Sequence, residues 1–455
     1  MSIIDELRKS NVIIVGAGMT GKSLANFLVK EKIEFQIFDE KISDMDGLPV
    51  LNELPQDIDL ALVSPGWKKD QSDIVNLRNR GVRLLSELDL AWSLKEILAP
   101  NQIWLGVTGT NGKTTTVQML ESILNQSQFR AIACGNVGLP VVEAVTSPEN
   151  FEVLAIELSS FQIEWSNLPK YQAISILNIA DDHIDWHETF DNYANSKLKL
   201  LDAAEISILN SNDPEIALRS TAHGGKKVFF SLSTPNPWEI GVVEELLVDR
   251  AFVANPQNAE SFGQLLDVHP SAPHNISNAM AAAGLALAIG VSHPVVNSGL
   301  KNFKLDHHRL ELVLSKDGID WINDSKATNP HAAKAALSSY QSNIWIAGGL
   351  AKGARMADLI SKTGSRIKAA ILIGQDRENI AAELLRLAPH VNIYRIDAEG
   401  DAQEMMDRVV TQAKDLAEVG DTVILAPACA SMDQFKSYAQ RGEFFSNSVR
   451  KILKA

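Results

Sequence analysis

The amino-acid sequence predicts an α/β protein of several domains whose sheets are mainly parallel. The chain has 455 residues, of which 45% are hydrophobic, so it is long enough for about three domains with separate cores. Two segments, near residues 16 and 109, have the order apolar run, glycine-rich turn and amphipathic stretch, which is typical of a strand leading into a helix. The last third alternates short apolar runs with amphipathic stretches, which indicates a further open α/β sheet.

The first of these segments predicts a β–α–β unit that binds a diphosphate. Residues 11–15 form an apolar run, residues 16–21 (GAGMTG) turn it into a helix, and residues 34–38 form a second run that ends at Asp39. The glycines permit a tight turn and close approach to a diphosphate, while Asp39 is placed to accept a hydrogen bond from a ribose hydroxyl. The pattern leaves open whether the ligand is NAD or another nucleotide, and a purely structural glycine turn is the alternative.

A further predicted strand, residues 60–63, ends in the sequence SPG at residues 64–66. Ligands of open α/β sheets collect at such carboxyl ends, so we expect these residues near the same ligand. The stretch APNQ at residues 99–102 then marks a domain boundary.

The densest chemical signal is the segment GVTGTNGKTTT at residues 106–116, which lies between an apolar run and an amphipathic stretch. Small residues allow backbone N–H groups to surround a phosphate chain, the following helix directs its positive end there, and Lys113 adds a full charge. Thr114 offers a hydroxyl to a magnesium ion. Val107 stands where the usual pattern has glycine, so an ordinary Gly-Asn turn between strand and helix is the alternative.

One carboxylate interrupts the next predicted strand, residues 153–158. Glu157 is unfavourable inside an apolar strand unless something pairs with it. After a phosphate loop the expected partner is magnesium, with Glu157 and Thr114 sharing one ion. The alternative is a glutamate at a strand end that faces water.

A further predicted strand, residues 173–179, precedes the acidic turn DDHID at residues 181–185. This turn is suited to binding a second metal or orienting a substrate, and a capping or surface histidine is the alternative. The predicted helix at residues 192–201 contains Lys197 and Lys199, which by themselves look like an ordinary solvated face.

Composition excludes several classes of protein. The net charge of −14 argues against non-specific nucleic-acid binding, because no excess of Lys and Arg exists to neutralise a phosphate backbone. Cys134 and Cys429 are too few for a disulfide framework, so we expect both to pack as small apolar residues in a reducing compartment. No basic leader and no apolar run of about 18 residues is present, which predicts a soluble, cytoplasmic protein without membrane insertion.

Five motifs together resemble the Mur ligase family. They are residues 108–116, ELSSFQ at 157–162, LNI at 177–179 with Asp182 and His183, NDSKATN at 323–329, and PACAS at 427–431. The resemblance covers essentially the whole chain in the right order. The stretches DSKATN and ACASMDQF are specific to the branch that adds D-glutamate.

The resemblance implies a Rossmann-like domain at residues 1–99 for the UDP end of the substrate, a central P-loop ATPase domain at residues 100–305, and a Rossmann-like amino-acid-binding domain at residues 306–455. It implies an ATP-dependent ligase that adds D-glutamate to UDP-N-acetylmuramoyl-L-alanine through an acyl phosphate, as a step of peptidoglycan precursor synthesis. ATP is split to ADP and phosphate. ATP and two Mg²⁺ ions are the expected cofactors, and a monomer is the expected state.

The resemblance also implies individual site residues. ATP is expected at Gly109, Thr110, Asn111, Gly112, Lys113, Thr114, Thr115, Asn275, Asn278, Arg309 and Asp324. The metal ligands are expected to be Thr114, Glu157, His183 and Lys197, with Lys197 carried as a carbamate. Lys113, Glu157, His183, Lys197 and Lys326 form the expected catalytic set.

The resemblance also implies substrate contacts. It implies that the glycine motif at residues 16–21 binds uridine diphosphate and not NAD. The UDP end of the substrate is expected at Met19, Thr20, Asp39, Glu40, Ser64 and Gly66, with further substrate contacts at Asn136 and Ser159. D-glutamate needs donors for two carboxylates. It is expected at Thr328, Lys352, Ser431, Met432 and Tyr438, although these residues could equally be loop and helix-cap groups.

Three alternatives remain at this level. A sibling ligase could add L-alanine, a diamino acid or a folate-linked glutamate, because these enzymes share the ATPase core. An NAD-dependent oxidoreductase would leave residues 108–116 unexplained and shows no hydride-transfer residues. An ATP-gated binding protein would bind nucleotide without turnover on any acceptor.

Overall fold

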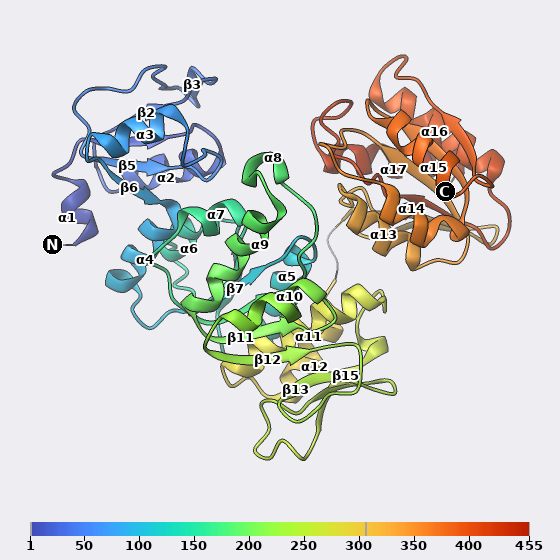
Figure 1. The fold of residues 1–455 in the computed structure, drawn as a ribbon, viewed down its shortest axis with the longest axis horizontal. Helices are drawn as coiled ribbons and strands as arrows, with labels where there is room; N and C mark the ends of the chain where they lie inside the picture. The colour runs from blue at the N-terminus through green and yellow to red at the C-terminus, as the bar shows by residue number, and fades with distance from the viewer. Residues whose placement is uncertain (1, 305–306, 455) are drawn as a thin grey trace. The chain divides into compact units, whose positions relative to one another are not determined.

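The computed structural model describes residues 2–304 and 307–454 and confirms the α/β prediction (Figure 1). The chain forms two compact units. One contains the residues up to Phe303 except residues 180–185, and the other contains those six residues and the residues from Lys304 onward. The predicted boundary between residues 305 and 306 lies outside the described residues.

The first sheet of the first unit is parallel, in the order β2-β1-β5-β6. Its strands and the small β3–β4 hairpin are β1 (Val12–Val15), β2 (Phe35–Phe38), β3 (Asp44–Met45), β4 (Leu48–Pro49), β5 (Leu60–Val63) and β6 (Arg83–Ser86). The helices here are α1 (Ile3–Leu7), α2 (Met19–Lys30), α3 (Ser72–Asn79) and α4 (Glu87–Leu98). Strands β1 and β5 are buried throughout, as expected for inner parallel strands. The strand order reverses between them, which is where α/β sheets bind ligands.

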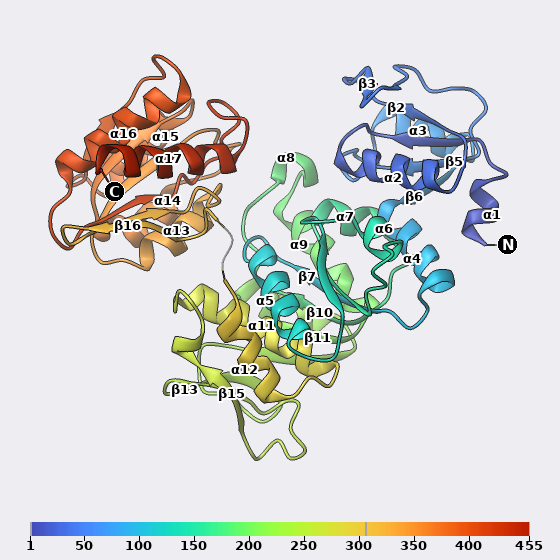
Figure 2. The ribbon, with the colours of Figure 1, turned by 180° about the vertical axis from the view of Figure 1, so that it is seen from behind.

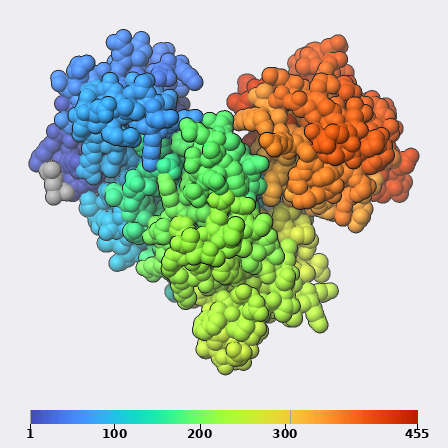
Figure 3. Space-filling model, in the orientation of Figure 1, coloured from blue at the N-terminus to red at the C-terminus, as the bar shows by residue number. Residues whose placement is uncertain are grey.

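The second sheet has the order β15-β14-β13-β12-β11-β10-β7-β9-β8 and is parallel from β8 to β13. Its strands are β7 (Ile103–Thr108), β8 (Ala131–Gly135), β9 (Val153–Glu157), β10 (Tyr171–Ile176), β11 (Ala204–Asn210), β12 (Lys226–Phe230), β13 (Glu239–Val243), β14 (Leu246–Asp249) and β15 (Glu260–Gln264). The last three pair antiparallel, and the chain around them forms a separate lobe of the first unit (Figure 3).

Helices α5, α11 and α12 pack on one another beside this sheet. The helices of this part are α5 (Lys113–Asn125), α6 (Val141–Val145), α7 (Ser160–Trp165), α8 (Ile184–His187), α9 (Phe190–Leu198), α10 (Pro214–Arg219), α11 (Pro273–Ala288) and α12 (His293–Asn302). A Cβ atom at Gly299 of α12 would lie 2.3 Å from the Cα atom of Ile123, so glycine allows α12 to approach α5 this closely.

The sheet of the second unit has the order β16-β17-β21-β18-β19-β20, and only β16 is antiparallel to its neighbour (Figure 2). The strands are β16 (Glu311–Lys316), β17 (Ile319–Asn323), β18 (Asn343–Gly348), β19 (Ile367–Ile373), β20 (Asn392–Arg395) and β21 (Thr422–Leu425). The helices are α13 (Pro330–Ser338), α14 (Ala357–Thr363), α15 (Arg377–Leu387), α16 (Ala402–Leu416) and α17 (Tyr438–Ile452).

This sheet has a hydrophobic core on each face, because successive side chains of a strand point to opposite faces. In β18, Trp345 packs with residues of α13, α14 and α15, whereas Ile344 and Ile346 pack with residues of α16 and α17. The unit is therefore a three-layer α/β/α sandwich. The sequence showed apolar runs in this region because strands that are buried on both faces are continuously apolar.

Three predicted elements end earlier than expected. The strand predicted at residues 153–158 ends at Glu157. The strand predicted to reach residue 179 ends at Ile176, and the helix predicted to reach residue 201 ends at Leu198, where a 3₁₀ turn follows. Both cysteines are buried and free, as expected. Among the described helices, none has the length and apolar character required to cross a membrane.

Candidate active site

The predicted phosphate loop connects β7 to α5 near the middle of the second sheet. Gly112 stands at the N-cap of α5 with φ of 84°, a conformation that favours glycine. A Cβ atom there would also lie 2.4 Å from Oδ1 of Asn278, which is a buried residue of α11. Both observations favour a residue without a side chain at this position. A backbone without side chains can approach a phosphate chain closely.

Asn178, which follows β10, makes hydrogen bonds to the backbone of this loop. Its Oδ1 accepts the N–H of Asn111 at 2.8 Å, its Nδ2 donates to the Asn111 carbonyl at 3.1 Å, and its own carbonyl accepts the N–H of Thr110 at 2.9 Å. The sequence singles out Asn178 only within the motif LNI at residues 177–179 and does not predict this role. The available signal was an asparagine at the end of a strand adjacent to the loop strand.

Two lysines converge on the loop carbonyls. Lys113 Nζ donates to the carbonyls of Gly109 at 2.9 Å and Thr110 at 3.0 Å, and Lys197 Nζ donates to the same Gly109 carbonyl at 3.1 Å. Lys197 is only 1% exposed, and its Nζ lies 4.5 Å from the centroid of the Tyr193 ring. Lys197 therefore lies beside the phosphate loop.

The solvated-face interpretation of the two lysines in the predicted 192–201 helix is thus wrong for Lys197. It holds for Lys199, which is half exposed and pairs with Glu164. The difference arises because α9 packs against α7 and because the Tyr193 hydroxyl lies 2.9 Å from Oγ1 of Thr110, which turns this face of the helix inward.

Glu157 ends β9, the strand beside β7, and is 3% exposed. Its Oε1 accepts a hydrogen bond from Nδ2 of Asn136 at 2.8 Å, whereas its Oε2 is buried without a hydrogen-bond partner in the described part of the chain. The alternative of a glutamate facing water is therefore wrong. A buried carboxylate oxygen without a donor is costly, so this position suits a cation. Thr114, in the first turn of α5, is 6% exposed.

His183 lies in the six-residue segment that belongs to the second unit. Its φ is 52°, its backbone N–H donates to Oδ1 of Asp182 at 3.0 Å, and its Nε2 lies 3.6 Å from Oδ2 of Asp182. Within residues 2–304 and 307–454, no three His, Cys, Asp or Glu side chains gather as a preformed metal site.

The remaining predicted nucleotide contacts of the first unit lie at or near the loop. Thr110 and Thr115 are buried beside it, and Asn275 is buried at the start of α11, where its Nδ2 donates to the Pro270 carbonyl at 3.2 Å. Pro273 occupies the first turn of this helix, where the absence of an N–H group costs nothing. Ser159 caps α7, its Oγ accepting the N–H of Gln162 at 3.2 Å.

The glycine turn of the first domain is braced by Asp39. Oδ2 of Asp39 accepts the N–H of Ala17 at 3.0 Å, and Oδ1 accepts the N–H groups of Lys41 and Ile42 at 2.9 and 3.2 Å. The carboxylate therefore orders the turn itself, besides the ribose contact we predict. Ser64 Oγ donates to the Gly16 carbonyl at 3.2 Å, which joins the ends of β1 and β5. Met19 and Glu40 are exposed beside them.

A pocket of the first unit lies at the junction of its two sheets. It is lined by Thr20, Pro65, Ser86, Glu87, Leu88 and Gln162. Two tryptophans connect the surrounding loops: Nε1 of Trp165 donates to the Trp67 carbonyl at 2.8 Å, and Nε1 of Trp186 donates to the Gly66 carbonyl at 3.2 Å. Gly66, a predicted substrate contact, is thereby fixed next to this pocket.

Glu87 lines this pocket, and its burial leads us to expect that the free energy of unfolding of the protein depends on pH. Glu87 is 4% exposed, its Oε1 accepts the N–H of Val142 at 2.6 Å, and burial raises its pKa from 4.5 to about 7. Between these two values the folded chain retains a proton that the unfolded chain has released. The contribution of this proton to the free energy of unfolding is therefore fully present below pH 4.5 and is lost as the pH rises through about 7.

Glu87→Gln keeps an acceptor for the Val142 amide and cannot ionise. We expect this variant to match wild type near pH 4.5 and to exceed its free energy of unfolding above pH 8 by about 3 kcal/mol. Urea unfolding across this pH range measures the difference, with exposed Glu149→Gln as the control. Parallel pH profiles for wild type and Glu87→Gln would contradict the prediction.

In the second unit, three loops meet at the carboxyl ends of neighbouring strands β17, β21 and β18. We call residues 324–329, 348–353 and 426–432 the carboxyl-edge loops. The Ala428 N–H donates to the Ala327 carbonyl, and Leu350 and Ala430 exchange both backbone hydrogen bonds, all at 2.9 Å. These loops bring together the predicted contacts Thr328, Lys352, Ser431 and Met432. Ser431 is buried, whereas Lys352 and Met432 are exposed.

Asp324 and Lys326 lie in the first of these loops. Burial raises the pKa of Asp324 to about 6, opposed by a hydrogen bond from the Leu310 N–H at 3.2 Å and by the charge of Arg309. Lys326 Nζ lies 5.3 Å from the centroid of the Tyr438 ring. Among the predicted residues, Arg309 therefore lies close to Asp324, and Lys326 lies close to Tyr438.

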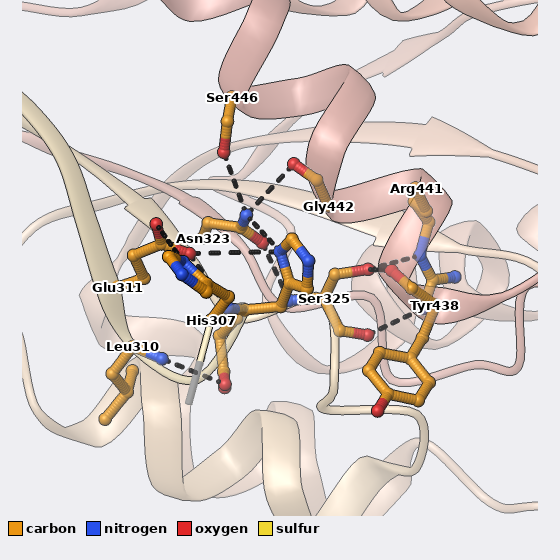
Figure 4. Close-up of polar contacts among 11 residues, drawn as sticks. His307, Leu310, Glu311, Asn323, Ser325, Tyr438, Arg441, Gly442 and Ser446 are labelled. Carbon is orange, nitrogen blue, oxygen red and sulfur yellow. Dashed lines mark hydrogen bonds and ion pairs between the residues drawn. The ribbon is translucent and has the colours of Figure 1, made fainter. Parts of the chain in front are cut away.

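Asn323, which we did not predict, organises the turn before this loop. Its Nδ2 lies 2.9 Å from Nδ1 of His308 and 3.0 Å from both the Gly442 carbonyl and Ser446 Oγ (Figure 4). Burial lowers the pKa of His308, opposed by Glu311. The neutral imidazole that this favours can accept from the Asn323 amide.

Comparison with known proteins places these features in a family. Residues 107–286 match the model of the Mur ligase middle domain, and residues 308–429 match that of the Mur ligase glutamate ligase domain. The chain belongs to the Mur ligase family. Mur ligases form amide bonds at the expense of ATP, and this chain is an ATP-dependent ligase of that kind.

Individual Mur ligases match over nearly the full chain. A relative from Thermobifida fusca, named UDP-N-acetylmuramoylalanine--D-glutamate ligase, is 43% identical over 467 aligned residues, which cover 98% of this chain and 99% of the relative. A Streptomyces coelicolor protein of the same name is 43% identical, with 88% and 86% covered.

Solved structures of Mur ligases share the fold. MurF from Acinetobacter baumannii has a TM-score of 0.62 at 16% identity, with 99% of this chain and 98% of that chain covered. UDP-N-acetylmuramate-alanine ligase from Thermotoga maritima has a TM-score of 0.60 at 15% identity, with 97% and 100% covered. The predictions of family, fold class and ATP-dependent ligation are confirmed.

Proposed function

We propose that this Mur ligase joins the amino group of D-glutamate to the L-alanine carboxyl group of UDP-N-acetylmuramoyl-L-alanine, as a step in making peptidoglycan precursors. The observation that carries this proposal is 43% identity, over 98% of the chain, to a ligase named for that reaction. We also propose that the enzyme is cytoplasmic and acts as a monomer. Two buried free thiols agree with a reducing compartment.

The first chemical step activates a poor electrophile. A carboxylate oxygen of the L-alanine residue attacks the γ-phosphorus of ATP, the bond to the bridging oxygen breaks, and ADP leaves an acyl phosphate behind. Lys113 and the N–H groups of the phosphate loop stabilise the moving negative charge. Lys113 Nζ now donates to two loop carbonyls, so it exchanges these acceptors for phosphate oxygens when ATP binds.

The residues beside the loop fit magnesium. The buried Oε2 of Glu157 lacks a hydrogen-bond partner among the described residues, and the hydroxyl of Thr114 is the second oxygen donor. Glu157 and Thr114 would hold one ion, and His183 with Lys197 as a carbamate would hold a second. Bound magnesium supplies charge neutralisation of the phosphates.

The second step forms the amide bond. The amine of D-glutamate attacks the carbonyl carbon of the acyl phosphate, the tetrahedral intermediate expels inorganic phosphate, and the amine loses its proton. We assign D-glutamate to the carboxyl-edge loops, where Thr328, Lys352 and Ser431 offer a hydroxyl, an ammonium group and a second hydroxyl. Met432 and Tyr438 border the same loops, and Lys326 is the adjacent cation.

The nucleotide substrate is assigned to the first unit. Met19, Thr20, Asp39, Glu40, Ser64 and Gly66 would contact uridine diphosphate, and Asn136 and Ser159 would contact the rest of the substrate. The position of Ser64 supports this assignment, because its hydrogen bond to the Gly16 carbonyl joins the carboxyl ends of β1 and β5, where α/β sheets bind ligands. ATP would extend from the phosphate loop towards Asn275 and Asn278, with Arg309 and Asp324 as further contacts.

Phosphate release with different amino acids tests the proposal. The enzyme is given ATP, Mg²⁺ and UDP-N-acetylmuramoyl-L-alanine, with D-glutamate, L-glutamate, L-alanine or meso-diaminopimelate supplied separately. We expect release with D-glutamate alone. Release with another amino acid would keep the ATPase assignment but overturn the acceptor, and no release with any of them would overturn the nucleotide substrate as well.

A further inference from the structure

Arg441 is a buried charge that the proposed mechanism does not use. It lies in the first turn of α17, is 1% exposed and is among the largest fully buried side chains of the described residues. Its four hydrogen bonds, counted within residues 2–304 and 307–454, all go to oxygen atoms of neutral groups. The negative charge of Asp433 acts on this guanidinium without a hydrogen bond to it. Burying a charge is costly, so a guanidinium whose hydrogen bonds all go to neutral acceptors calls for a specific role.

The four bonds reach all three carboxyl-edge loops. Nε donates to Ser325 Oγ at 3.0 Å and Nη2 to the Ser325 carbonyl at 2.9 Å, both in the first loop. Nη1 donates to the carbonyls of Gly348 at 3.5 Å and Cys429 at 3.2 Å, in the second and third loops. Figure 4 shows the guanidinium of Arg441 facing Ser325. One side chain therefore connects three loops that are far apart in the sequence.

The guanidinium is itself held in place. Ser325 Oγ, which accepts from Arg441, donates to the Tyr438 carbonyl at 2.7 Å, so the loop is tied to the start of α17 at two points. A planar guanidinium presents its donors in a rigid fork, which fixes the spacing of the carbonyls around it. A few residues beyond these acceptors stand Thr328, Lys352 and Ser431, the proposed donors to the amino acid.

We propose that Arg441 is a positioning residue that sets the three carboxyl-edge loops in the arrangement required to bind the incoming amino acid. This inference rests on the proposed function, which assigns D-glutamate to these loops. Burial lowers the pKa of Arg441 to about 10, so the fork remains charged at neutral pH. Small displacements of binding groups reduce catalysis strongly, which is why the role is visible in kinetics.

Two substitutions separate geometry from charge. Arg441→Lys keeps a charge but loses the planar fork, and Arg441→Met loses both. We expect the KM for D-glutamate to rise at least about tenfold in each, while the KM for UDP-N-acetylmuramoyl-L-alanine, which is assigned to the first unit, stays within about twofold of wild type. Arg450→Lys, an exposed arginine of the same helix, is the matched control and should change neither constant.

Hydrogen exchange supplies a readout that does not depend on activity. In Arg441→Lys the amides of Leu350, Ala428 and Ala430, which bridge the loops, should exchange at least about tenfold faster, while amides of β19 keep their wild-type rates. Unchanged loop exchange and an unchanged KM for D-glutamate would overturn the inference. Equal acceleration in β19, or an equal rise in the KM for UDP-N-acetylmuramoyl-L-alanine, would reduce Arg441 to a general stabilising role and also overturn the inference.

The proposed function and the role of Arg441 can fail separately. If the wild-type enzyme does not turn over D-glutamate, the proposed function is wrong. The exchange rates of the loop amides still report whether Arg441 holds the loops together.

Discussion

Lys113→Ala is expected to lower the kcat for phosphate release by on the order of a thousandfold or more, because the loop loses the one full charge that its first helical turn places at the phosphates. The fold should persist, since alanine is a good helix former at this N-terminal position of α5. Steady-state phosphate release measures the effect, and circular dichroism with a thermal melt verifies the fold.

The control for this substitution is Lys199→Ala, which removes an exposed lysine paired with Glu164. It should retain wild-type turnover. If folded Lys113→Ala turned over ATP at a rate close to that of wild type, residues 106–116 would not be the phosphate loop of this ligase.

Removal of the Lys197 side chain is expected to have a comparable effect. This lysine is buried against the Gly109 carbonyl and the Tyr193 ring, and the proposed carbamate would place a carboxylate-like group beside the loop. Lys197→Ala should lower kcat by on the order of a thousandfold, as expected when a charged group at the phosphates is lost. Formate or acetate should restore part of the activity by occupying the vacated space.

Carbon dioxide provides a second test of the same residue in the unaltered enzyme. Wild type should lose activity in carbon dioxide-depleted buffer and regain it with bicarbonate, whereas Lys197→Ala should not respond to bicarbonate. An absence of response to bicarbonate and to carboxylates would leave Lys197 as an ammonium group that orders the loop through Gly109. Lys199→Ala again serves as the control.

Many sheet strands could be predicted because their signal is local. The run at residues 60–63 coincides with β5, since a strand covered on both faces must be apolar at every position. Strands β6, β8 and β11 to β17 were not predicted. Several of their residues are exposed or charged, as in Lys226–Phe230, so they lack the continuous apolar pattern.

The candidate site likewise contains some residues that the sequence revealed and others that it did not. The predicted phosphate loop was recognisable because Gly109, Gly112, Lys113 and Thr114 lie within six consecutive residues. Asn178 and Arg441 were missed because each acts through partners that are close only after folding. Asn178 reaches Asn111 across neighbouring strands, and Arg441 reaches loops 12 to 116 residues away in sequence.

The sequence by itself determined the α/β class, the glycine-rich turn between β7 and α5, and the family. Each depends on the order and spacing of nearby residues. Only the tertiary structure decided that Lys197 is buried while Lys199 is solvated, that Glu157 has a carboxylate oxygen without a donor in the described chain, and that Arg441 joins three loops. The physical reason is that the environment of a charged side chain is set by the elements packed against it, and these come from distant parts of the chain.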